Sequence, residues 1–133
     1  MSYIENARRL RPIVEQAMQS VDDKTASEAA QLFPVLNGGG SLVKSGTRIN
    51  WKGAIKKAGV DLWDTADNNP DNAPNLWADL DYIDGYRIIP ETITVTTAFA
   101  KDELGWWDGV LYRSLLNANV YTPKQYPDGW EKV

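Results

Sequence analysis

The chain contains no cysteine and no histidine, so the reactive side chains it offers are carboxylates, lysines and tyrosines. Disulfides, thiolate and imidazole metal sites, and serine or cysteine nucleophiles paired with histidine are therefore excluded. Carboxylates such as Glu91, Asp102 and Glu103 would suit glycoside hydrolysis only as a pair across a substrate cleft, and a body this small implies no cleft. The residue types predict a non-enzymatic protein without a cofactor.

Residues 59–85 form an aspartate-rich segment that contains no lysine or arginine. Its seven aspartates are Asp61, Asp64, Asp67, Asp71, Asp79, Asp81 and Asp84. Within it, Asp67-x-Asn69-x-Asp71 matches the first half of a calcium-binding EF-hand loop. However, Asn72 stands where that loop needs glycine, and Ala78 where it needs a bidentate glutamate. We expect a solvated acidic loop that binds no metal.

Aromatic residues are the most distinctive part of the composition, because six tryptophans and six tyrosines accompany only two phenylalanines. Tryptophan and tyrosine combine a large apolar face with a polar edge, which suits binding surfaces. The length of 133 residues suffices for one compact domain or two very small ones. The net charge of −4 disfavours nucleic acid as a partner. No apolar run approaches a membrane span or a signal peptide, so we expect no membrane partner either.

Residues 2–33 are predicted to be helical, with an apolar seam at heptad spacing. The seam comprises Tyr3, Ala7, Leu10, Val14, Ala17 and Val21. Pro12 is expected to break this helix or to start a new one, because proline lacks the amide hydrogen that a helix interior needs. A second helix, capped by Asp22 or Asp23, is expected to run to Leu32. The seam either packs on the rest of the chain or mediates self-association, and we predict a homo-oligomer.

Beyond Pro34 the sequence has β character. Residues 47–58 are expected to form a hairpin that turns at Lys52-Gly53, and Thr92–Thr97 alternates like a strand. A second hairpin is expected at Asp108-Gly109, because this dipeptide supplies the positive φ angles of a two-residue type I′ turn.

Two copies of a degenerate pattern, W-x-G followed by P-x3-P-x2-W, occupy this β-rich part of the chain. The first copy begins at Trp51 and closes at Trp77, and the second begins at Trp107 and closes at Trp130. Both motifs recur in the same order, which indicates an internal duplication. We therefore predict an α+β protein in which two small, mainly antiparallel β modules follow a helical leader. The leader, the degenerate first module with its linker, and the second module are placed at residues 1–33, 34–91 and 92–133.

The hairpin Trp107–Tyr112 and the closing segment Pro127–Trp130 follow the patterns aromatic-x-G-x-x-Y and P-x-x-W. In these two segments the second module resembles the carbohydrate-binding modules of families 5 and 12. Those modules are small chitin- and cellulose-binding β domains found in chitinases. The resemblance implies a β module that binds polysaccharide by aromatic stacking.

Further segments extend the resemblance over nearly the whole chain. They are residues 7–12, 32–34, 73–77, 85–91 and 119–123, which read A-R-R-L-R-P, L-F-P, A-P-N-L-W, G-Y-R-I-I-P-E and N-V-Y-T-P. With a leader that ends in L-F-P before such modules, the chain is similar to small phage and prophage proteins of Gram-positive hosts. This similarity implies a protein that is made in the host cytoplasm, resides in the virion and contacts other virion proteins.

The two copies differ in their aromatic residues. Lys56 and Asn68 stand in the first copy where the second has Tyr112 and Tyr121, so the first module is expected to be structural. The tryptophans that both copies share are expected to build the module cores: Trp51, Trp77, Trp107 and Trp130. The aromatics found only in the second copy are expected to contact the sugar: Tyr121 first, then Trp106, Tyr126 and Tyr112.

These inferences favour a non-enzymatic structural or accessory protein on the tail, fibre or capsid surface of a phage. Its second module would attach to host or environmental polysaccharide. The alternative is a capsid decoration or assembly protein whose modules serve only protein–protein contacts. Retention on insoluble chitin, cellulose or Gram-positive cell walls distinguishes the two.

Overall fold

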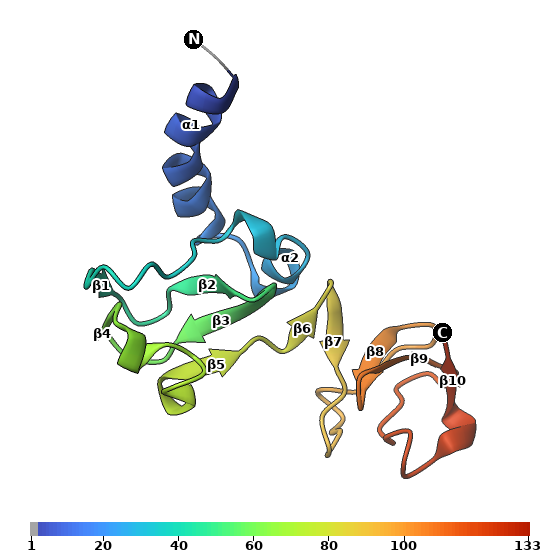
Figure 1. Ribbon diagram of the computed structural model, residues 1–133. Coiled ribbons are helices and arrows are strands. Elements are labelled where there is room, and N and C mark those ends of the chain that lie inside the picture. The colour runs from blue at the N-terminus through green and yellow to red at the C-terminus, as the bar shows by residue number, and fades with distance from the viewer. Residues whose placement is uncertain (1–2) are drawn as a thin grey trace. The chain divides into compact units, whose positions relative to one another are not determined.

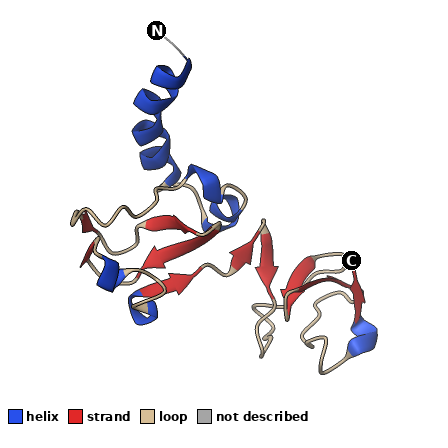
Figure 2. Ribbon diagram, viewed as in Figure 1, coloured by secondary structure: helices blue, strands red, loops and turns tan. Residues whose placement is uncertain are grey.

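The computed structural model describes the backbone of residues 3–133 and the side chains from Glu5 onward. The structure is α+β, with one long helix and several small sheets of short strands joined by long loops (Figures 1 and 2). Contacts within the chain define two compact units, the first ending at Leu80 and the second beginning at Asp81.

The first unit combines helices with a three-stranded antiparallel sheet in the order β2-β3-β5 and a two-stranded ribbon, β1-β4. Its helices are α1 (Tyr3–Met18) and α2 (Asp23–Ser27), and its 3-10 turns are η1 (Ala30–Leu32), η2 (Ala66–Asn68) and η3 (Pro74–Leu76). Its strands are β1 (Leu42–Val43), β2 (Arg48–Trp51), β3 (Ala54–Ala58), β4 (Leu62–Trp63) and β5 (Trp77–Asp79).

The three-stranded sheet of this unit is covered on both faces. Ile49 packs into one cluster with the β1-β4 ribbon and Trp77. Ile55, on the opposite face, packs into a second cluster with Ala26 and Phe33 of the leader. The C-terminal part of the leader is therefore an integral layer of the first unit's core.

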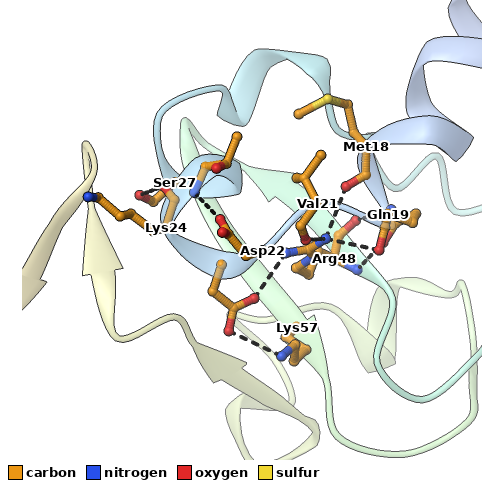
Figure 3. A network of polar contacts seen from close by, with 10 residues as sticks. Met18, Gln19, Val21, Asp22, Lys24, Ser27, Arg48 and Lys57 are labelled. Carbon is orange, nitrogen blue, oxygen red and sulfur yellow. Dashed lines mark hydrogen bonds and ion pairs between the residues drawn. The ribbon is translucent and has the colours of Figure 1, made fainter.

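The buried side chain of Arg48 connects the leader to this sheet (Figure 3). Its guanidinium donates hydrogen bonds to the carbonyls of Met18, Gln19 and Val21 at 3.0, 3.0 and 2.6 Å, and to the carboxylate of Asp23 at 3.0 Å. The Gln19 side chain in turn accepts from the Arg48 amide and donates to its carbonyl. These bonds give a side-chain partner to the carbonyl of the last residue of α1 and to two carbonyls in the segment that follows it, where the backbone bonds of the helix end.

The leader differs from its prediction in two ways. First, α1 runs uninterrupted through Pro12, so the expected break there is wrong. Pro12 is exposed, and water can satisfy the helix carbonyl that its missing amide hydrogen leaves without a partner. Second, the helix capped by Asp22 ends at Ser27, and only the short turn η1 follows before Phe33-Pro34.

The residues of the predicted seam differ in their burial along the helix. Val21 packs on the core of the first unit, whereas Ala7, Leu10 and Ala17 are exposed. The side chain of Tyr3 lies outside the described residues. Packing on the rest of the chain thus accounts for the end of the seam but not for its beginning.

The second unit contains a five-stranded sheet in the order β10-β9-β8-β7-β6. Its strands are β6 (Tyr82–Ile83), β7 (Tyr86–Ile88), β8 (Leu104–Trp107), β9 (Val110–Ser114) and β10 (Trp130–Lys132), and the turn η4 (Pro127–Gly129) precedes the last. Neighbouring strands are antiparallel except β7 and β8, which are parallel. The sheet begins at Tyr82, earlier than residue 92, where the sequence places the start of the second module.

The two predicted hairpins are confirmed. Trp51 pairs with Ala54 and Trp107 pairs with Val110, so each turn contains two residues. In the second turn φ is 53° at Asp108 and 75° at Gly109, and the first turn is likewise left-handed at both positions. These are the angles of a type I′ turn.

Both units form the same hydrogen bonds at equivalent positions of the sequence repeat. The indole nitrogen of Trp77 donates to the carbonyl of Asn68, and that of Trp130 donates to the carbonyl of Tyr121, each at 2.7 Å. Further equivalent pairs are Ala58 to Thr47 and Ser114 to Glu103, and Gly59 to Leu76 and Leu115 to Gly129. The repeated sequence pattern therefore corresponds to a repeated backbone structure.

The predicted strand at Thr92–Thr97 is wrong, because this segment folds back on itself as a turn. The Thr97 amide donates to the Thr94 carbonyl at 3.0 Å, and the Thr97 hydroxyl accepts from the Thr94 amide at 2.9 Å. Threonine hydroxyls compete with a β-ladder for backbone partners. Local bonding of this kind outweighs the strand propensity, and Val95 is left 88% exposed.

Replacement of Arg48 by methionine is predicted to destabilise the first unit by about 3 kcal/mol or more, because the leader carbonyls and Asp23 lose their buried cationic partner. Lys44→Met is the matched control in the same unit. Its ion pair with Asp61 is exposed, so we expect a cost below about 1 kcal/mol. Denaturant unfolding measures both. Equal stabilities of the two variants would contradict the anchoring role of Arg48.

Substitution of Gly109 by valine is predicted to destabilise the second unit by more than about 1 kcal/mol, because a β-branched residue is strongly disfavoured at positive φ. A side chain at this position meets no neighbouring atom, so the cost arises from the backbone alone. Gly109→Asn is the control, since asparagine tolerates left-handed backbone. In thermal unfolding, the melting temperatures of wild type and Gly109→Asn should lie well above that of Gly109→Val. A Gly109→Val melting temperature equal to that of wild type would refute the backbone argument.

Candidate functional site

The candidate site lies on the loop between β9 and β10 of the second unit, visible in Figure 2 as the long connection that leads into η4. Thr122 and Gln125 hold this loop by reciprocal bonds. The Thr122 amide donates to the Gln125 side-chain oxygen at 2.9 Å, and the Gln125 amide donates to the Thr122 hydroxyl at 3.1 Å. The Thr-Pro-Lys-Gln sequence thus acts as a capping box around one turn.

Trp130 fixes the backbone of this loop at Tyr121. Its indole ring is 6% exposed and packs edge-on against Phe99, with ring centroids 5.3 Å apart. Its ring nitrogen donates to the Tyr121 carbonyl, while the Tyr121 amide donates to the buried side chain of Asn119 at 3.1 Å. Tyr121 is therefore held through both of its backbone polar groups.

Tyr121 and Tyr126 flank the turn of residues 122–125 in this loop and pack against each other. Their ring centroids are 5.8 Å apart and their planes lie at 71°, an edge-to-face contact. Tyr121 remains 49% exposed and Tyr126 43% exposed. The pair forms a rigid aromatic surface that the protein itself does not cover.

The other two predicted sugar-binding residues lie in different settings. Trp106 is half-buried on β8, and its indole nitrogen donates to the Ile83 carbonyl at 2.8 Å. Tyr112 is half-buried on β9 and packs against the hydrophobic cluster of this unit. Tyr112 thus contributes mainly to the core, which agrees with its position opposite Gly105 in the sheet.

A groove of about 1010 Å³ runs between the sheet and the same loop. Polar and aromatic side chains line it together, including Glu91, Trp106, Trp107, Asp108, Lys124 and Gln125. Lys124 and Gln125 come from the loop that carries Tyr121 and Tyr126, so the loop contributes to both surfaces. Aromatic faces beside a few charged and amide groups are the usual lining of small-molecule sites.

Of the four tryptophans that the two copies share, two are buried as a core role requires. Trp77 and Trp130 are buried. Trp51 and Trp107 are half-buried and pack against the clusters of their own units, while Trp107 also lines the groove. Sequence reasoning did not single out Trp63, which is 58% exposed. Successive residues of a strand point to opposite faces, so a buried Leu62 places Trp63 on the exposed face.

The aspartate-rich segment serves mainly as a set of hydrogen-bond acceptors. Asp64 is buried, in contrast to the expected solvated loop, and its carboxylate accepts from the amides of Asn37 and Gly38. The Ser45 amide lowers the pKa of Asp61, and Lys52 together with the Trp51 indole lowers that of Asp71. Within the described residues, no group of three or more metal-ligating side chains comes together.

The carboxylates weighed for catalysis lie in three different settings. Both oxygens of Glu103 are occupied, one by Arg87 at 3.0 Å and the other by the Ala100 amide at 3.0 Å. Asp102 occupies a turn with φ of 69°, and Glu91 lines the groove.

Comparison with models of known protein families found no match, and comparison with curated proteins found none either. In the described part of the chain, no helix has the length and apolar character needed to cross a membrane.

Proposed function

We propose that this chain is a non-enzymatic, virion-associated protein of a phage or prophage whose second unit binds polysaccharide. The observation that carries the binding proposal is the exposed Tyr121–Tyr126 pair, held on a loop that the buried Trp130 fixes from below. A fixed aromatic surface suits a weak ligand such as a sugar, because little side-chain entropy is lost on binding. The assignment to a phage particle rests on the sequence resemblance.

The groove beside the loop supplies the polar half of such a site. Glu91, Asp108, Lys124 and Gln125 offer acceptors and donors of the kind that hydroxyl and amide groups of a sugar require. Trp106 adds an aromatic wall to the same groove. A polysaccharide chain would thus stack on the tyrosines and direct its polar groups into the groove.

The replacement Tyr121→Ala is predicted to reduce retention on insoluble chitin, cellulose or Gram-positive cell walls by about tenfold, the loss of about 1.4 kcal/mol of contact energy. The melting temperature should not change, because the lost side chain is half exposed and Trp130 binds only the backbone of residue 121. Tyr86→Ala is the matched control, since Tyr86 is 39% exposed on β7, away from the loop. Sedimentation with the polymer measures retention.

A second variant separates binding from folding. Trp130→Ala should cost about 3–5 kcal/mol of stability and lose retention through unfolding of the second unit. Retention of Tyr121→Ala equal to wild type would contradict the assigned surface. Failure of the wild-type protein to bind any of the three polymers would contradict polysaccharide binding itself.

The exposed seam of α1 favours the second candidate function, a decoration or assembly protein. Leu10 of the seam is 49% exposed, and Ile13, which lies outside the seam on the same helix, is 62% exposed. The heptad spacing of the seam matches the pattern of a helix that pairs with another copy. Pro12 lies at the heptad position farthest from the seam, where its ring would not obstruct a partner. Self-association through α1 is compatible with sugar binding by the second unit.

The double substitution of Leu10 and Val14 by serine is predicted to convert a homo-oligomer into a monomer without loss of fold. Gln16→Ser, on another face of α1, should leave the oligomer intact. Deletion of residues 1–21 is a less selective test, because it also removes the carbonyls that bind Arg48. Light scattering at high concentration measures the mass, and a monomeric wild-type protein would refute self-association.

A further inference from the structure

Trp63 is the only exposed tryptophan among the described residues, and it lies in the first unit, which the sequence suggests is purely structural. It stands on β4, directly opposite Leu42 of β1, which is itself 45% exposed. Tryptophan is on average highly buried, and an exposed ring with a polar edge suits a binding surface. The exposure of Trp63 therefore makes it a candidate contact residue.

The backbone around Trp63 is fixed on both sides. Its carbonyl accepts from the Thr65 amide at 2.8 Å and from the Asn68 side chain at 2.9 Å. The next residue, Asp64, is buried and bonded through its amide, carbonyl and carboxylate to residues 37–41. Trp63 thus projects from a rigid base, as Tyr121 does in the second unit.

The two residues also occupy the same loop of the repeat. Val43 pairs with Leu62 in the first unit as Phe99 pairs with Asn119 in the second. Trp63 follows the first of these pairs, and Tyr121 follows the second. The closing tryptophan of the first unit binds the carbonyl of Asn68, which follows Trp63 in this loop, and that of the second unit binds the carbonyl of Tyr121 itself. Each unit therefore presents an exposed aromatic residue after the strand pairing and no later than the carbonyl that its closing tryptophan binds.

The size and charge of the surface restrict its ligand. Trp63 and Leu42 form a small apolar patch, far less than the roughly 800 Å² per partner of a standard protein interface. Beside it runs the glycine loop 38–40, in which positions 38 and 40 border open space. The surrounding segment has aspartates and no lysine or arginine from residue 59 to 85, which disfavours a polyanion. A neutral or amine-bearing sugar ring fits both the small size of the patch and its acidic surroundings.

We infer that Trp63 is a second saccharide-stacking surface, so that one chain binds one polysaccharide through both of its units. This inference rests on the proposed function of the second unit and extends it to the first. Two linked weak sites on one polymer raise apparent affinity by roughly 10²- to 10⁴-fold over either site alone. The gain is absent with a soluble oligosaccharide too short to reach both sites.

The test compares full-length wild type with Trp63→Ala, Tyr121→Ala and the double variant, using crosslinked chitin as the polymer and a chitin trisaccharide as the short ligand. Val35→Ala is the control, since Val35 is 65% exposed in the same unit. Trp63→Ala should weaken chitin retention by tenfold or more and leave trisaccharide binding at the second unit unchanged. In Tyr121→Ala, excess trisaccharide should still shift the indole N–H resonance of Trp63. This resonance is assigned as the one that is missing from the spectrum of the double variant.

Two results would overturn the inference while leaving the proposed function intact. One is that Trp63→Ala is retained on chitin as strongly as wild type, while the Trp63 indole resonance of the Tyr121→Ala variant does not shift when trisaccharide is added. The other is a smaller mass of Trp63→Ala in light scattering with unchanged retention, which would assign the patch to contact with a second copy. If the wild-type protein binds neither chitin nor the trisaccharide, and also fails on cellulose and cell walls, both the inference and the proposed function fall.

Discussion

The hydrogen bond from a buried tryptophan to a loop carbonyl is the constraint on which both units depend. An indole ring supplies much of the apolar area that a small unit can bury, but its N–H requires a partner inside the protein. Trp77 and Trp130 each find that partner in the backbone of the loop that covers them. Burial of the ring and immobilisation of the loop are therefore coupled.

In each unit one arginine packs beside a buried phenylalanine ring; Arg48 is buried and Arg87 is half-buried. Arg48 lies 5.3 Å from the ring centroid of Phe33, and Arg87 lies 3.8 Å from that of Phe99. Each guanidinium also binds backbone carbonyls and one carboxylate. A planar cation can stack on an aromatic face and satisfy several carbonyls at once, which an aliphatic side chain cannot do. Residues far apart in the sequence are thereby joined around very few apolar side chains.

The sequence predicts the features that local chemistry determines. The Lys52-Gly53 and Asp108-Gly109 turns and the repeated closing tryptophans follow from turn geometry and from spacing. The errors occur where a local rule meets a competing contact. The hydroxyls of the Thr92–Thr97 segment bond within the segment. Helix α1 continues through Pro12, which is exposed, so water can satisfy the carbonyl that loses its partner. The partners of Arg48 lie about 30 residues away along the chain, and no periodicity encodes contacts of that kind.

The candidate site shows a further limit of position-by-position comparison between the two copies. The closing tryptophan binds a backbone carbonyl, so the side chain at that position is free to be tyrosine in one unit and asparagine in the other. Alignment of Asn68 with Tyr121 correctly shows that the first copy lacks this tyrosine. It does not show that the first loop, which is three residues longer between Trp51 and Pro70 than between Trp107 and Pro123, exposes Trp63 five positions before Asn68. Because the closing tryptophan binds a backbone carbonyl, both units keep the structure of the loop. The exposed aromatic side chain can therefore stand at a different position of the loop in each unit.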